Sequence, residues 1–200
     1  MKRLLVSISC VLLLLAATAS PALADADHFY MVNAYGEGAM QVDASAKTVT
    51  PVDAVPLGAD VRIQGAWLTT SFGLANSVPG AILQRLAVLD PKGNPIPACA
   101  VDESTCRGFW AAPFLLSEWD TPLSWETPYN PKRSAGVWMR LWLVPFVPLT
   151  SGTYTIVYTE VWTRAIADPM WERPGSYPPV YPAMEWPTSV VTFEVVPKSR

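Results

Sequence analysis

Apolar and polar residues alternate with a two-residue period along several stretches of this 200-residue chain. Residues 190–196 show the pattern clearly, since Val191, Phe193 and Val195 share one face and polar residues separate them. The pattern recurs in three further stretches, residues 61–70, 82–89 and 137–144. A period of two residues is typical of half-buried β-strands. We therefore expect an all-β fold.

Prolines and turn residues stand between the alternating stretches. Of the 20 prolines, 19 lie after residue 24, so long helices are not expected in that part of the chain. Between residues 90 and 94, Pro91 presets φ and Gly93 tolerates the positive φ that a turn requires. Helix content should be small. No internal repeat or low-complexity linker divides the chain.

One short segment indicates a particular kind of β fold. Leu149–Tyr154 places Gly152 two residues before Tyr154, at the start of an alternating strand. This arrangement resembles the tyrosine corner of immunoglobulin-like β-sandwiches, in which the tyrosine hydroxyl bonds a backbone group a few residues upstream. The resemblance implies an antiparallel sandwich in which Tyr154, Ile156 and Tyr158 face the core.

The same resemblance gives a strand letter to most of the chain. The expected strands are a split strand A at 29–35 and 40–49, B at 61–70, C at 82–89, E at 137–144, F at 152–162 and G at 188–196. An antibody-type module is not expected, because Ile156 stands where antibody domains have a cysteine and the expected strand C has no tryptophan. A jelly roll is the alternative fold.

The first 24 residues have the features of a cleavable signal peptide. Lys2 and Arg3 precede an apolar stretch that is shorter than the ~20 residues a spanning helix needs. Pro21–Ala24 then supplies small residues for cleavage. We expect residues 25–200 to form one exported domain, in the periplasm, at the cell surface or outside the cell. No second apolar run is long enough to span a membrane.

Removal of the signal peptide changes the charge and the cysteine count. Without Lys2 and Arg3, basic residues fall from 14 to 12 against 17 acidic ones, and the net charge goes from −3 to −5. Such a domain is a poor partner for nucleic acid or an anionic membrane. Cys10 also leaves, so Cys99 and Cys106 remain as an expected disulfide that stabilises by roughly 2–3 kcal/mol. Two metal-ligating thiolates are the alternative, but no histidine lies nearby.

Long D–E and F–G loops of the expected sandwich are rich in aromatic residues and proline. In immunoglobulin-like domains the B–C, D–E and F–G loops gather at one end, and here they would cover residues 71–81, 117–135 and 164–187. Loops of this length are usually functional, and stiffly held aromatic side chains give contact area at low entropic cost. The predicted ligand-binding residues are Trp119, Trp125, Tyr129, Trp171, Tyr177, Tyr181 and Trp186.

The ligand of such a surface would be a glycan, an extended peptide or a protein, because indole faces stack on sugar rings and on apolar side chains. The structural alternative is that these loops fold over the open end of the sandwich and bury a satellite core. Burial of Trp119, Trp125, Trp171 and Trp186 would argue for that alternative.

A second aromatic group lies on the expected strand E. Trp138, Arg140 and Trp142 alternate on the face opposite the presumed core. We expect a cation–π ladder covered by a neighbouring loop. A flat ligand platform is the alternative.

Enzymatic and metal chemistry find little support. His28 is the only histidine, and no nucleophile elbow accompanies it, so a Ser-His-Asp relay is not expected. Paired carboxylates would have to come from Glu118, Glu126 and Glu185, and acidic residues on loops are usually solvated. We expect a monomeric, non-catalytic binding module that holds no cofactor and no metal.

Two other functions stay open. The chain resembles periplasmic copper-binding proteins of the CopC type in layout, which implies a copper ligand at His28, although the histidine expected after strand F is absent. The methionines that would offer soft ligands to Cu(I) are Met31, Met40, Met170 and Met184. The other alternative is a protease inhibitor or surface-assembly subunit, because residues 174–182 resemble a stiff polyproline-II strand.

Overall fold

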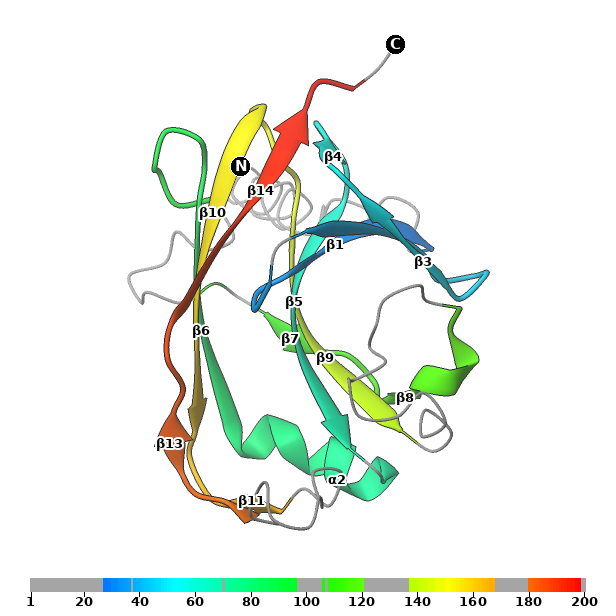
Figure 1. Ribbon diagram of the computed structural model, residues 1–200, viewed down its shortest axis with the longest axis vertical. Helices are drawn as coiled ribbons and strands as arrows, with labels where there is room; N and C mark the ends of the chain where they lie inside the picture. The colour runs from blue at the N-terminus through cyan, green and yellow to red at the C-terminus, as the bar shows by residue number, and fades with distance from the viewer. Residues whose placement is uncertain are drawn as a thin grey trace, which may run out of the picture.

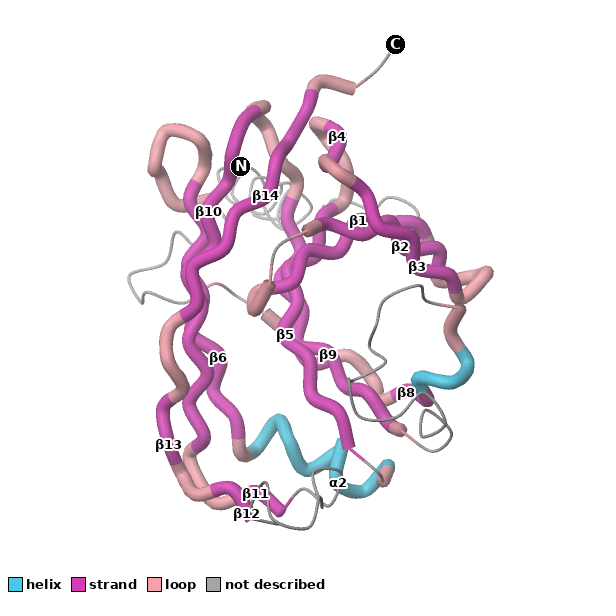
Figure 2. Tube along the Cα trace, in the orientation of Figure 1, coloured by secondary structure: helices cyan, strands magenta, loops and turns pink. Residues whose placement is uncertain are grey.

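The structure, a computed structural model, is mostly β and contains two mixed sheets (Figures 1 and 2). It describes residues 27–36, 38–69, 71–96, 106, 108–120, 137–167 and 180–198. The expected signal peptide and Cys99 lie outside these residues, so cleavage and the Cys99–Cys106 disulfide stay predictions. Among the residues described, no helix is long and apolar enough to cross a membrane.

The larger sheet has seven strands in the order β3-β2-β1-β5-β9-β7, with β8 also paired to β9. Its strands are β1 (His28–Asn33), β2 (Ala39–Asp43), β3 (Thr48–Val52), β5 (Val61–Thr69), β7 (Phe109–Trp110), β8 (Phe114–Leu115) and β9 (Trp138–Phe146). We call it sheet A.

The second sheet, sheet B, is centred on β10, which pairs with β6 on one side and with β14 and β13 on the other. Its strands are β4 (Val55–Pro56), β6 (Ile82–Leu89), β10 (Gly152–Trp162), β13 (Met184–Glu185) and β14 (Ser189–Val196). Outside the two sheets lie α2 (Phe72–Ser77), the 3₁₀ turns η1 (Val78–Gly80) and η3 (Leu116–Glu118), and the paired strands β11 (Ile166–Ala167) and β12 (Val180–Tyr181).

The all-β prediction with little helix is confirmed. The expected strands B, C, E, F and G correspond to β5, β6, β9, β10 and β14, with ends that differ by at most two residues. The expectation of purely antiparallel sheets is wrong, because β1 pairs with β5 in parallel and β4 pairs with β14 in parallel. A local pattern of alternation carries no information about the direction of a distant partner strand.

The main core lies between the two sheets, since it contains buried side chains of both. Sheet A contributes Ile63 and Val144 among others, and sheet B contributes Tyr154, Ile156 and Tyr158. These last three side chains are at most 2% exposed, which confirms that they face the core. Each apolar side chain of this size stabilises the fold by about 1.5–3 kcal/mol when fully buried.

The connection between β9 and β10 has the corner geometry that the sequence indicated. The Tyr154 hydroxyl donates to the carbonyl oxygen of Thr150 at 3.1 Å. Gly152 has φ of +127°, a conformation that side chains with a Cβ rarely adopt. The hydrogen bond and the glycine together fix the sharp entry into β10.

Both faces of sheet A are buried, and this overturns one expectation. Met139, Leu141 and Leu143 of β9 belong to a second apolar cluster on the face of sheet A away from sheet B. Trp142 and Val144 instead belong to the main core. Trp142 therefore does not lie on a face opposite the core, because an alternating strand buried on both sides has two apolar faces.

The second cluster is enclosed because sheet A curves back on itself (Figure 1). After β8 and η3, the backbone of Asp120 accepts a hydrogen bond from Val49 at 3.0 Å and donates one to Lys47 at 2.9 Å. Pairing thus runs from β3 through β2, β1, β5, β9 and β8, and Asp120 returns it to β3. Lys47 and Glu118 also form an ion pair at 2.6 Å beside this closure.

Candidate functional site

The helix α2 connects three parts of the chain at one end of the molecule, the lower end in Figure 1. The Ser71 side chain caps its first turn by accepting a hydrogen bond from the Leu74 amide at 3.1 Å. Arg140 of β9 donates to the carbonyl of Ala75 at 3.3 Å and to the side chain of Asn76 at 2.9 Å. A basic group near the last carbonyls of a helix is favourable.

The segment after β10 also contacts this region. The Thr163 amide and hydroxyl both donate to the carbonyl of Ala81, at 2.8 and 3.0 Å. The Arg164 guanidinium donates to the carbonyl of Ser77 at 3.4 Å. The segment between β5 and β6 therefore lies against both the start of β9 and the residues that follow β10.

An exposed aromatic pair lies at this end. Phe72, the first residue of α2, is 50% exposed, and its ring packs edge to face with that of Trp138 at 4.9 Å between centroids. Trp138 is half-buried at the first position of β9. The pair presents apolar surface on a helix whose position is fixed by the Ser71 cap and by Arg140.

A cluster of tryptophans lies near the ends of β5 and β10. Trp162 of β10 packs against Trp67 of β5 at 5.0 Å and against Trp186 at 5.2 Å between ring centroids. Trp67 and Trp162 are buried together with Val78 and Ile82. This cluster joins the ends of the two sheets, and it includes Val78, the residue at the C-terminal end of α2.

The predicted ligand-binding residues divide into two groups. Trp119 packs on the second apolar cluster and meets Phe114 at 5.4 Å, and Trp186 packs on the tryptophan cluster. Both side chains are partly buried against these clusters. The other predicted residues, Trp125, Tyr129, Trp171, Tyr177 and the side chain of Tyr181, lie outside what the structure describes.

A buried carboxyl group lies between the tryptophan cluster and the main core. Glu160 of β10 is 5% exposed, and it accepts hydrogen bonds from the Tyr35 hydroxyl and the Trp162 indole nitrogen. The Tyr158 hydroxyl donates to it as well, at 3.2 Å. The hydroxyls of Tyr35 and Tyr158 are 2.9 Å apart, and their rings meet edge to face at 4.8 Å.

Burial sets the protonation chemistry of this group. Desolvation raises the pKa of Glu160 to about 7, and the hydrogen bond from Trp162 opposes this shift. Desolvation also raises the pKa of Tyr158, so this phenol stays protonated. Gly65 of β5 faces the Tyr158 hydroxyl, which would lie 2.7 Å from a Cβ at that position. The close approach of β5 and β10 here thus depends on a glycine.

The Glu160 site was not among the predicted residues, although a signal for it exists. Glu160 follows Tyr154, Ile156 and Tyr158 at the same two-residue spacing. An acidic residue on the core face of a strand indicates a buried, partnered carboxyl. Tyr35, by contrast, reaches it from a turn after β1, and no local pattern predicts that contact.

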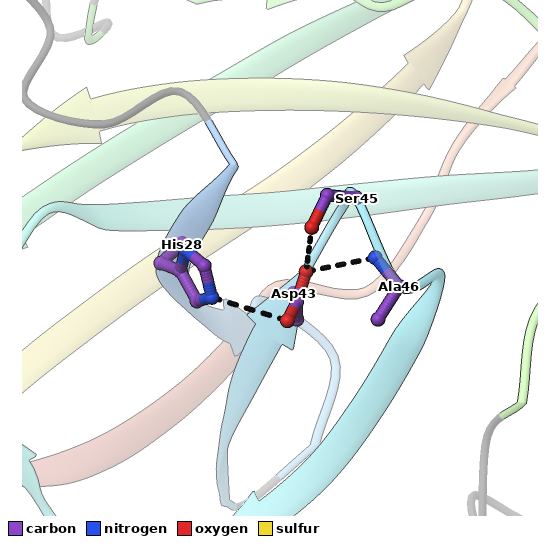
Figure 3. A network of polar contacts seen from close by, with 4 residues as sticks. All are labelled: His28, Asp43, Ser45 and Ala46. Carbon is purple, nitrogen blue, oxygen red and sulfur yellow. Dashed lines mark hydrogen bonds and ion pairs between the residues drawn. The ribbon is translucent and has the colours of Figure 1, made fainter.

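The groups considered for metal binding have other partners. The His28 ring nitrogen lies 3.1 Å from the Asp43 carboxylate, and Asp43 also accepts from the Ala46 amide and the Ser45 hydroxyl (Figure 3). The Ala46 amide, then Ser45 and His28, lower the pKa of Asp43. In the described part of the chain, no group of three or more histidine, cysteine or acidic side chains is placed to hold a metal.

Two of the methionines considered as soft ligands lie within an apolar cluster. Met31 and Met40 face each other across β1 and β2 and are each 5% exposed. Met184 packs on the tryptophan cluster, and Met170 lies outside the described residues. Methionine in such surroundings fills space between other apolar side chains.

The acidic residues considered for paired catalysis are engaged separately. Glu118 pairs with Lys47, and Glu185 pairs with Arg85 at 3.2 Å, each on the surface. Glu126 lies outside the described residues.

Comparison with known proteins gives no family for this chain. No protein-family model, no curated protein and no solved structure matches it.

Proposed function

We propose that this protein is an exported, non-catalytic binding module with an immunoglobulin-like β-sandwich fold. The pairing of β5 with β9 corresponds to strands B and E of such a sandwich, and β6-β10-β14 corresponds to strands C, F and G. The Tyr154 corner supports the same assignment. The parallel pair of β4 and β14 adds a short strand beside G.

The observation that carries the binding proposal is the exposed Phe72–Trp138 pair. A half-exposed phenylalanine packed edge to face with a tryptophan gives a ligand apolar contact area. Because Ser71 and Arg140 hold α2 in place, little conformational entropy is lost when a ligand binds. Aromatic anchors held in this way dominate the affinity of many interfaces.

The ligand class that suits this end is a glycan, an extended peptide or a protein surface. Aromatic rings stack on sugar rings and on apolar side chains alike. Trp125, Tyr129, Trp171, Tyr177 and Tyr181 remain proposed contacts from the D–E and F–G loops, while Trp119 packs on the second apolar cluster and Trp186 on the tryptophan cluster.

The test is binding of the Phe72→Ala variant to glycan and peptide arrays. We expect the variant to lose at least tenfold in affinity for any ligand that the native protein captures, with its unfolding midpoint nearly unchanged because Phe72 is half exposed.

The matched control is Leu149→Ala. Leu149 is 75% exposed and lies in the connection between β9 and β10, at the opposite end of the strands from α2. Equal losses in both variants, or full binding by the Phe72 variant, would contradict the assignment of the binding surface to the α2 end.

A further inference from the structure

The turn after β1 closes over the Glu160 carboxyl from the surface. Tyr35 is 45% exposed, yet its hydroxyl reaches a carboxyl group that is only 5% exposed. The backbone of this turn is held by three hydrogen bonds: the Ala34 amide donates to the carbonyl of Gln64 and the Tyr35 amide to the Asn33 side chain, both at 2.9 Å, and the Ser189 hydroxyl donates to the carbonyl of Ala34 at 2.7 Å.

Glu160 connects this turn to the centre of the tryptophan cluster. The carboxyl oxygen that accepts from Tyr35 and Tyr158 is Oε2, and the one that accepts from the Trp162 indole is Oε1. The surface turn and Trp162 are therefore linked through one buried side chain. Among the residues described, Tyr35 is the exposed side chain that contacts it.

We propose that Tyr35 is a proton-controlled latch: ionisation of Glu160 favours displacement of the Tyr35 ring, which admits water between the two sheets beside Trp162. This device is independent of the binding surface proposed above. It requires movement of the Tyr35 side chain and its turn, and the paired strands stay in place.

The direction of the effect follows from linkage. Burial by Tyr35 and its surroundings holds the pKa of Glu160 at about 7, whereas a carboxyl hydrated through an open turn would return toward its ordinary value. The closed form thus binds the proton more tightly than the open form, so a rise in pH shifts the population toward the open form.

Among the residues described, three hydrogen-bond donors but no cation contact the Glu160 carboxyl. Tyr35 and Tyr158 are the titratable groups in direct contact with it. Gln84, its register partner on β6, is uncharged, and on β5 Gly65 faces Tyr158 and Gln84 while Trp67 packs on Trp162. On the facing sheet, the Arg140 guanidinium is engaged by Ala75 and Asn76 of α2. Ionisation is therefore best stabilised by water.

Exchange of the Trp162 indole hydrogen with solvent tests the latch, because this hydrogen is bonded to Glu160 and becomes accessible when water enters. NMR of the full chain gives its protection factor once the intrinsic pH dependence of indole exchange is removed. We expect protection to fall by up to roughly 70-fold from pH 5 to pH 8, the ratio implied by pKa values of 4.5 when hydrated and about 7 when buried.

Two variants and one control complete the experiment. Glu160→Gln should make protection independent of pH. Tyr35→Phe should lower protection already at pH 5, since the latch hydroxyl is gone. Glu194→Gln, which alters an exposed carboxyl that also accepts a hydroxyl hydrogen bond, from Thr153, should behave like the native protein.

Three results would overturn the latch. The first is native protection that is equal at pH 5 and pH 8. The second is a fall that persists in Glu160→Gln. The third is an equal fall in protection of the Ile156 amide at the centre of β10, which would mean global unfolding. If Glu160→Gln does not fold, Tyr35→Phe decides, because native-like protection at pH 5 in that variant contradicts the proposal.

Discussion

Single residues on the inner face of β10 determine how closely the two sheets approach. Tyr158 reaches across to β5 at Gly65, where a Cβ would lie 2.7 Å from the phenol oxygen and 3.3 Å from its ring carbon. The glycine lets this phenol lie beside Glu160, and Tyr35 then covers the pair from the surface. The hydrogen bond between Tyr158 and Glu160 therefore depends on the absence of a side chain at Gly65.

At the same scale, Glu160 makes stability depend on pH. Its pKa is about 7 in the folded protein against an ordinary value of 4.5, so between these values the folded state binds more protons than the unfolded state. Its contribution is fully present below pH 4.5 and is lost as pH rises through about 7. The loss amounts to roughly 3 kcal/mol, from about 1.4 kcal/mol per pKa unit.

Urea unfolding at pH 4.5, 6 and 8 measures this dependence. The native protein should lose stability over the range, and Glu160→Gln should lose markedly less. Equal slopes in the two proteins would show that Glu160 is not the group responsible.

Among the elements, the corner between β9 and β10 offers a local test of the fold. Tyr154→Phe removes the hydroxyl that donates to Thr150 and keeps the buried ring. Loss of one such hydrogen bond costs about 1 kcal/mol. Thermal and urea unfolding should show a loss of this size with an unchanged far-ultraviolet spectrum.

A suitable comparison is Tyr30→Phe, since Tyr30 is only partly buried against the main core. If Tyr154→Phe is no less stable than Tyr30→Phe, the corner hydrogen bond does not stabilise the connection.

The strands were predictable because alternation records which side of a strand meets solvent. β14 shows this plainly, with Val191, Phe193 and Val195 buried and the residues between them exposed. The expected position of Trp142 opposite the core is wrong because both faces of β9 are buried: Met139 faces one cluster and Trp142 the other. Alternation then no longer indicates which face meets the main core.

Other features depend on contacts between distant residues. The helix α2 has six residues, too few for a helical period to be recognised. The parallel pairing of β1 with β5 and the contact of Tyr35 with Glu160 join segments that are far apart in sequence. Of the predicted aromatic site, the packing of Trp119 and Trp186 on apolar clusters depends on side-chain positions, which alternation does not indicate.

At the scale of the molecule, the shared core predicts that both sheets unfold together. Ile63 of sheet A and Leu86 of sheet B lie in one cluster, each at most 1% exposed. Ile63→Ala or Leu86→Ala should therefore cost about 2–5 kcal/mol and shift a single transition.

Tryptophan fluorescence and far-ultraviolet circular dichroism are the two probes for this test. They should give coincident unfolding curves in the native protein and in both variants. Separate transitions, with each substitution moving only one of them, would mean that the sheets are independent units.

The pairing of β4 with β14 has a consequence for the order of assembly. Val55 is the register partner of Val195, so an early strand has its neighbour only when β14 is present. Closing so long a loop is slow, because the loss of chain entropy comes before the contact contributes any stabilisation. A nascent chain that lacks β14 leaves the core open along the edge of β10 and stays loosely organised. For a protein proposed to be exported, this delay keeps the polypeptide unfolded, and so able to cross a membrane, until β14 is present.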